Sequence, residues 1–97
     1  MIMQACAVYD KKVNAYMLPQ FFRTRGEAMR AFMDAVNSEQ APWKRHAEDY
    51  LFCLLGTYDD SSGVTVNKDV PEILMSAMDC VVLDNNNLSS SAALGSA

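Results

Sequence analysis

The chain has little of what metal sites and nucleophilic enzymes are built from. It contains one histidine, His46, and three cysteines, Cys6, Cys53 and Cys80, with no Cys-x-x-Cys pair. Widely spaced cysteines inside apolar segments argue against a disulfide scaffold and a structural zinc site, and are typical of small buried side chains in a reducing compartment. The sequence also lacks Gly-x-Ser-x-Gly, a glycine-rich phosphate loop and His-Glu-x-x-His. We therefore predict no metal, no cofactor and no enzymatic activity.

Two groups of polar residues could argue against this prediction. His46 precedes Glu48 and Asp49 closely enough for a His–carboxylate pair. A loop histidine that hydrogen-bonds the turn ahead of the next strand is the favoured interpretation. Asp59 and Asp60 favour a hairpin turn, where aspartate caps backbone amides, over a metal site that would need more oxygen ligands.

Long apolar runs are also missing. The longest contain about five residues, against the roughly 20 of a membrane-spanning helix. The N-terminus shows no basic segment followed by an apolar stretch, so we expect no signal peptide. The 97 residues, 51% of them hydrophobic, suffice for one domain with a modest core. We predict that domain over residues 1–84, and a flexible polar tail over residues 85–97.

The formal net charge of −4 argues against a protein that coats nucleic acid through bulk positive charge. The charge is unevenly distributed, however, because residues 11–46 sum to +4 and residues 47–97 sum to −7. Such an asymmetry excludes strong charge-driven coating of DNA, and leaves room for a weak contact through the basic segment.

Hydrophobic periodicity predicts an α+β fold: a small antiparallel or mixed sheet with the element order ββαββ, and one amphipathic helix packed on it. Pro19 predicts that the second strand lies at an edge or breaks there. Asn14 and Gly63 suit the left-handed conformations of tight turns. The expected strands cover residues 2–9, 15–22, 49–58 and 64–67, and the expected helix covers residues 25–36, after a capping box from Thr24 to Glu27.

Residues 70–83 are ambiguous. Pro71 is a good first residue for a helix, and the apolar residues 80–83 are typical of a strand. We expect a short helix or turn from Pro71 through Met78, followed by an extended piece.

Two segments that flank the expected helix combine cations with aromatic rings. Residues 21–25 (Phe-Phe-Arg-Thr-Arg) precede the helix and residues 42–46 (Pro-Trp-Lys-Arg-His) follow it, so they lie at one end of it or at opposite ends. Proteins bind single-stranded nucleic acid with such residues when rings stack on bases and cations contact phosphates. Alternatively, Phe21, Phe22 and Trp43 pack against the core and the cations form a solvated rim, which composition alone favours.

Short motifs follow one another in a fixed order through residues 5–72. The front half contains Ala7-Val8-Tyr9-Asp10, Ala15-Tyr16, Pro19, Phe21-Phe22-Arg23-Thr24, Gly26-Glu27-Ala28, Arg30-Ala31-Phe32 and Val36-Asn37. The back half contains His46, Glu48-Asp49-Tyr50, Leu55-Gly56, Tyr58-Asp59-Asp60 and Gly63. In this order they resemble the small non-structural protein of microviruses of the gokushovirus type, which are icosahedral single-stranded DNA phages. The sequence departs from that family at Asn14, where glycine is usual, at Ala47, where proline often follows the histidine, and after Leu83.

The resemblance implies an early phage protein in the host bacterial cytoplasm, absent from the virion, that serves viral single-stranded DNA synthesis or binds DNA. It brings no catalytic residues with it. The matched positions that are candidate contacts are Tyr16, Phe22, Arg23, Arg25 and Arg30.

Together, the resemblance and the composition predict a non-enzymatic accessory factor of phage genome replication that binds single-stranded DNA weakly. A homodimer would double the binding surface. The alternative is a protein-interaction module whose acidic half docks a viral replication protein or a host protein. The candidate DNA contacts are Tyr16, Phe22, Arg23, Arg25, Arg30, Trp43, Lys44 and Arg45.

Overall fold

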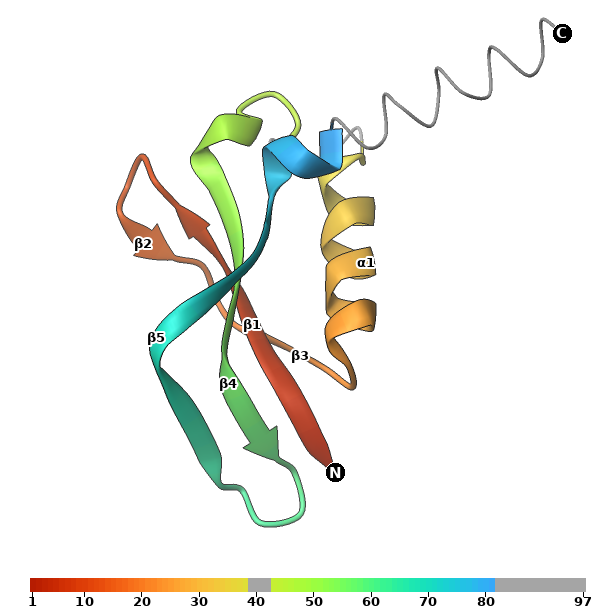
Figure 1. Ribbon diagram of the computed structural model, residues 1–97, viewed down its shortest axis with the longest axis vertical. Coiled ribbons are helices and arrows are strands. Elements are labelled where there is room, and N and C mark those ends of the chain that lie inside the picture. The colour runs from red at the N-terminus through yellow and green to blue at the C-terminus, as the bar shows by residue number, and fades with distance from the viewer. Residues whose placement is uncertain (39–42, 82–97) are drawn as a thin grey trace, which may run out of the picture.

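The computed structural model describes residues 1–38 and 43–81, where one long helix lies against a five-stranded antiparallel sheet (Figure 1). The predicted α+β class and ββαββ order are confirmed, with the second strand divided into two short ones. The sheet has the order β2-β1-β4-β5, and β3 pairs with the same edge of β1 as β2. The elements are β1 (Ile2–Asp10), β2 (Ala15–Tyr16), β3 (Gln20–Phe22), α1 (Arg25–Val36), β4 (Tyr50–Asp59) and β5 (Thr65–Ser76).

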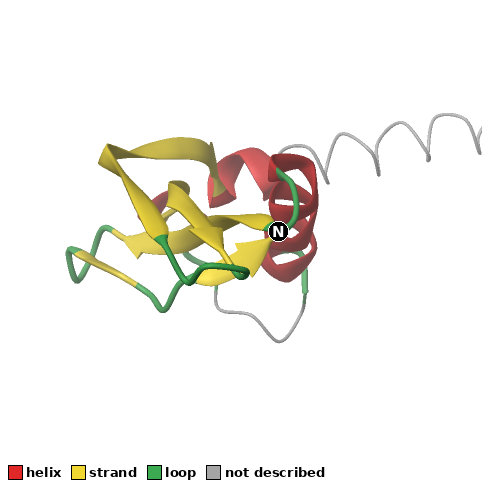
Figure 2. Ribbon diagram, turned by 90° about the horizontal axis from the view of Figure 1, so that it is seen from below, coloured by secondary structure: helices red, strands yellow, loops and turns green. Residues whose placement is uncertain are grey.

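The core lies between α1 and one face of the sheet, and no described element covers the other face (Figure 2). At its centre, Phe32 of α1 stacks on Phe52 of β4, with ring centroids 4.6 Å apart and an interplanar angle of 5°. Only one face contributes, so the core is modest, as the chain length predicts. Its buried members include Cys6, Val8, Ala28, Phe32, Val36, Phe52, Leu54 and Met75.

Three local signals in the sequence form as predicted. The hydroxyl oxygen of Thr24 accepts a hydrogen bond from the backbone N–H of Glu27 at 3.0 Å, which caps α1. Asn14 has a left-handed φ of 54° in the turn between β1 and β2. Gly63 has a φ of 76° in the turn between β4 and β5.

Pro19 divides the return strand, as expected of a residue without an N–H. The segments on either side of it both pair with β1, but residues 17–19 lie opposite only residues 7 and 8. The additional residue makes this linker bulge away from the sheet. Leu18, at its centre, is 88% exposed.

The prediction for residues 70–83 is wrong. In place of a helix from Pro71 and a following extended piece, β5 continues through Pro71 to Ser76, and residues 77–81 are helical. A proline is tolerated here because β5 is an edge strand. The helical turn begins where it does because Ser76 Oγ accepts from the N–H of Asp79 at 3.0 Å, while the Asp79 carboxylate accepts from the N–H of Ser76 at 3.2 Å. The predicted tail and residues 82–84 lie outside the described residues.

β5 does not follow β4 evenly. Four residues of β5, 68–71, lie opposite a single residue of β4. Beyond this bulge the two backbones approach so closely that a β-carbon at Gly56 would overlap the carbonyl oxygen of Val66. Glycine is therefore required at position 56 by the neighbouring strand.

We expect Gly56→Ala to lower the free energy of unfolding by about 2 kcal/mol or more, since overpacking a fixed backbone contact costs about 1–3 kcal/mol. Urea denaturation followed by circular dichroism measures this. The matched control is Gly26→Ala in α1, where the nearest atom to an added β-carbon is 3.9 Å away. That change should raise stability by up to about 1 kcal/mol. Equal effects of the two substitutions would contradict the clash.

Candidate nucleic-acid interface

Among the described residues that strand register places on the face of the sheet opposite α1, none has a charged side chain. Side chains alternate along each strand, so the residues between the buried core positions point to this side. We call this surface the open face. Its members, placed by strand register, are Met3, Ala5, Ala7, Tyr9, Tyr16, Phe21, Leu51, Cys53, Gly56, Tyr58, Thr65, Asn67 and Ile73.

Two pairs of aromatic rings stand on the open face. Tyr9 and Tyr16 are direct cross-strand neighbours, with ring centroids 4.8 Å apart. Phe21 and Tyr58 form the second pair, at 5.3 Å. Tyr16 and Phe21 each remain 46% exposed. Both pairs thus present ring surface to solvent on a rigid sheet.

Small residues separate the two pairs. Phe21 lies opposite Ala5 in the ladder, four residues along β1 from Tyr9, which is a distance of about 13 Å at the usual rise of a strand. Ala7 and Cys53 pair across the floor between them and are each 2% exposed. The hydroxyl of Tyr9 donates to Asn14 Oδ1 at 3.2 Å, which fixes one ring of the first pair.

The structure separates the residues predicted to contact DNA. Tyr16 lies on the open face, and Arg23 follows β3 directly and is exposed. Arg30 is also exposed, but it stands on α1. The segment after Phe21 and the segment from Trp43 lie at opposite ends of α1, so of the two arrangements left open by the sequence the second is correct (Figure 1).

Phe22 and Trp43 belong to the core side of the sheet. Phe22 packs edge-on against Phe52, with centroids 6.3 Å apart. Trp43 contacts Phe32 at 5.7 Å and Tyr50 at 6.2 Å. Lys44 and Arg45, which follow Trp43, are exposed and belong to the segment at the other end of α1 from residues 21–25. Four of the predicted contacts therefore do not share a surface with Tyr16: Phe22, Trp43, Lys44 and Arg45.

Arg25 makes a structural ion pair. Its guanidinium donates two hydrogen bonds to the carboxylate of Glu72, at 2.7 and 2.9 Å, and Lys68 Nζ lies 3.2 Å from the same carboxylate. The first residue of α1 is thereby tied to the edge strand β5. The Arg25 hydrogen bonds and those of Lys68 hold the pKa of Glu72 below its ordinary value.

Three rings that share the open face with Tyr16 were not among the contacts predicted from the sequence. They are Tyr9, Phe21 and Tyr58. The alternation of Tyr9 with buried Val8 was a usable signal. Lys11 and Lys12, in the turn directly after β1, are exposed and follow Tyr9 in the chain with only Asp10 between. Arg23 lies two residues after Phe21.

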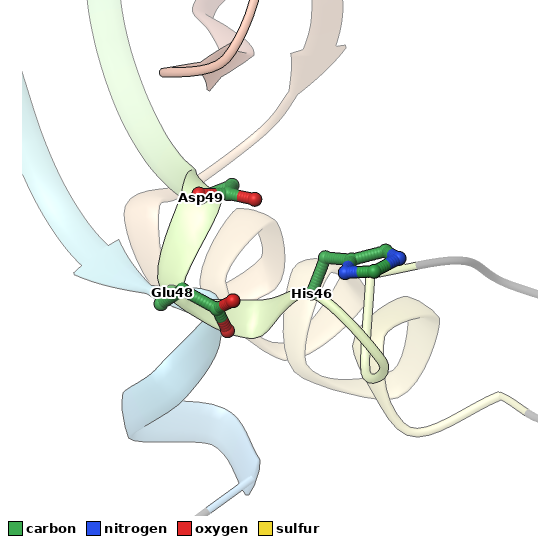
Figure 3. Close-up of side chains that lie close together, drawn as sticks. All are labelled: His46, Glu48 and Asp49. Carbon is green, nitrogen blue, oxygen red and sulfur yellow. The ribbon is translucent and has the colours of Figure 1, made fainter.

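His46, Glu48 and Asp49 lie together on the 3₁₀ turn that leads into β4 (Figure 3). One ligating atom from each lies within 4.8 Å of the others, and this is the one such group of three within residues 1–38 and 43–81. The group is exposed or half-exposed, which is common for acidic surface residues that hold no ion. The backbone carbonyl of His46 accepts from the N–H of Asp49 at 2.9 Å, but the His46 side chain makes no capping hydrogen bond to this turn.

The cysteines are small buried core residues, as predicted. All three thiols are free and buried. Burial raises the pKa of Cys6 and that of Cys80 to about 11. Both are therefore neutral thiols at physiological pH, unlike the thiolates that act as nucleophiles. The absence of enzymatic activity stays a prediction.

We expect Glu72→Gln to reduce stability in urea at neutral pH. The lowered pKa of Glu72 means that its ionised form stabilises the fold above its ordinary pKa, and that this contribution is lost as the pH falls through the lowered value. The difference between variant and wild type should therefore vanish in acid. Glu48→Gln, on the exposed 3₁₀ turn, is the control and should show little difference. A gap that persists unchanged into acid would rule out the ion pair as its cause.

Within the described residues, no helix is long and apolar enough to cross a membrane. Neither the curated proteins nor the solved structures include a match to the chain. A family model described as phage ORF5 protein matches residues 3–80, a range that contains α1 and reaches into every strand. The resemblance to a phage protein is thereby confirmed, and the chain belongs to the phage ORF5 protein family.

Proposed function

We propose that this phage ORF5 protein binds single-stranded DNA through its open face, as an accessory factor in genome replication of a gokushovirus-type microvirus in the cytoplasm of its bacterial host. The observation that carries the proposal is the two exposed aromatic pairs of the open face, whose members placed by strand register include no charged residue. The type of phage and the role in genome replication are inferred from the resemblance of residues 5–72 to the microvirus protein.

Base stacking gives this face its affinity. Every base has a π-face, so exposed rings bind single strands with little regard to sequence. The two aromatic pairs, about 13 Å apart along β1, offer a single strand two separate stacking sites. Duplex DNA hides its base faces and offers these rings nothing to stack on.

Electrostatics make the binding weak and sensitive to salt. The net charge is −4, so attraction to phosphates comes from local cations only. Lys11 and Lys12 lie in the turn after β1, within three residues of Tyr9, and Arg23 lies two residues after Phe21. A few such contacts give a shallow dependence of affinity on salt concentration.

The alternative, docking of a basic partner through the acidic half, has less support. Several of its acids are already engaged inside the protein. Glu72 pairs with Arg25 and Lys68, Asp79 caps the turn at Ser76, and the Asp59 carboxylate accepts from the N–H of Ser61 at 2.9 Å. A carboxylate in such a bond is less free to bind a partner's cation.

The first test concerns the rings. Tyr16→Ala and Phe21→Ala should each weaken binding to a fluorescent oligo-dT by about fivefold to a hundredfold, because one stacked base contributes about 1–3 kcal/mol. Fluorescence anisotropy in low salt measures the affinity. Tyr16→Phe keeps the ring and should bind like the wild type, and Val70→Ala, at a 76% exposed site on β5, should have no effect. No binding by the wild type, or full binding by both alanine variants, would refute the proposal.

The second test concerns the phosphates. Replacing Lys11 and Lys12 together by Gln should reduce the slope of log affinity against log salt by about 1.4, since each single-strand phosphate contact contributes about 0.7. The matched control replaces Lys44 and Arg45, which lie away from the open face, and should leave the slope unchanged. A smaller slope for the Lys44 and Arg45 variant, with an unchanged slope for the Lys11 and Lys12 variant, would show that DNA binds at the end of α1 near Trp43 instead.

A further inference from the structure

An apolar cleft opens on the α1 side of the sheet, and none of the four rings of the open face lines it. It lies between α1, β1 and the linker of residues 17–19, and has a volume of about 380 Å³. None of the residues around it is charged, and Gln20 supplies the one polar side chain. The lining includes Val8, Ala31, Phe32, Ala35 and Trp43. An uncharged lining of this kind fits apolar side chains and does not fit a phosphate or a nucleotide.

A large apolar side chain stands beside the cleft, and no residue of 1–38 or 43–81 covers it. Leu18 is 88% exposed, the highest value among the large hydrophobic residues of the described chain, and Met17 next to it is 39% exposed. Both border the cleft. Their exposure follows from the bulge of residues 17–19, which pushes the linker outward from β1. Met17, Leu18 and the apolar cleft form one continuous apolar surface, and such surfaces are typical of interaction sites.

We propose that a second copy of this chain covers the cleft, and that each Leu18 enters the cleft of the other copy. A protrusion and a hollow side by side on one surface are self-complementary, because a two-fold axis between them brings each onto the other in the partner. Both contacts then form at once. The occupant of the cleft is thus already present on the chain, whereas no other described segment supplies it.

Charge at the rim of the cleft is compatible with this arrangement. Arg30 and Asp34 are exposed on α1, one turn apart, and flank the cleft residues Ala31 and Ala35. When two copies of α1 meet in antiparallel orientation, Arg30 of one copy approaches Asp34 of the other. The small side chains of Ala31 and Ala35 allow the helices to come close.

The dimer is expected to be weak. The surface available is one side of a helix about 18 Å long together with a three-residue linker, which places the interface at the small end of the observed range, below about 1,200 Å² in total. The open face stays free on each copy, so dimer formation and DNA binding are independent.

Sedimentation equilibrium of the full chain over a wide concentration range tests the proposal. The wild type should show a monomer–dimer equilibrium, and Leu18→Asp should raise the dissociation constant by at least about tenfold. Leu18 is solvent-exposed in the monomer, so this variant should fold normally, which circular dichroism checks. Val70→Asp, on the exposed edge of β5, is the matched control and should stay within about twofold of the wild type. Trp43, the single tryptophan, lines the cleft, so its fluorescence should shift to the red when the wild type is diluted.

Cross-linking of two variants tests the geometry. When Leu18→Cys and Ala31→Cys proteins are mixed under mild oxidation, a disulfide-linked heterodimer should form, because Leu18 of one copy lies against Ala31 of the other. The native cysteines are buried and should not compete. A wild type that is monomeric throughout, a dimer unaffected by Leu18→Asp, a dimer lost in Val70→Asp, or a dimer without this cross-link would each overturn the proposal.

Discussion

The stacking of Phe32 on Phe52 holds the one long helix of the described chain to one face of the sheet, and the rest of the structure depends on this one-sided packing. With ring planes only 5° apart, the contact sets how closely α1 approaches β4. Phe22 and Trp43 then pack around the same two rings. Because the helix covers only one face, the side chains that alternate away from the core lie on the open face, where Tyr16 and Phe21 are exposed.

That division explains why the aromatic residues have such different roles. Neighbours in sequence, Phe21 and Phe22, point to opposite faces: one ring lies with Tyr58 on the open face and the other lies in the core. The same alternation separates Tyr9 from Val8. Aromatic content alone therefore does not tell which rings are available for binding. The face of the sheet to which each ring points determines that.

Most of the fold could be predicted from the sequence because its signals are local. The capping threonine, the left-handed Asn14 and the break at Pro19 each act within a few residues. The course of residues 70–81 could not be predicted. Pro71 favours a helix start in isolation, and only pairing with β4, which is distant in sequence, makes it part of a strand. Ser76 and Asp79 form a capping pattern that is visible in the sequence. It identifies the start of the helical turn only once the pairing of β5 with β4 is known.

The candidate site was less predictable than the fold for the same reason. Arg23, Arg25 and Lys44 are recognisable as cations from sequence, but their surroundings depend on tertiary structure. Arg25 faces Glu72, which is 47 residues away. The break at Pro19 also shifts the register of the return strand, so the direction of Phe21 could not be assigned from alternation before β3 was seen to pair with β1.

The bulge in β5 has a consequence for the behaviour of this protein in a crowded cell. An exposed edge strand with free backbone groups is a template for adding strands from other chains. The exposed side chains of Val66 and Val70 would favour such addition through hydrophobic contact. Four residues looped out opposite one, with Lys68, Asp69 and Pro71 among them, interrupt the straight run of donors and acceptors that an incoming strand requires. The distortion of β5 thus guards the sheet against aggregation at its only long unpaired edge in the described chain.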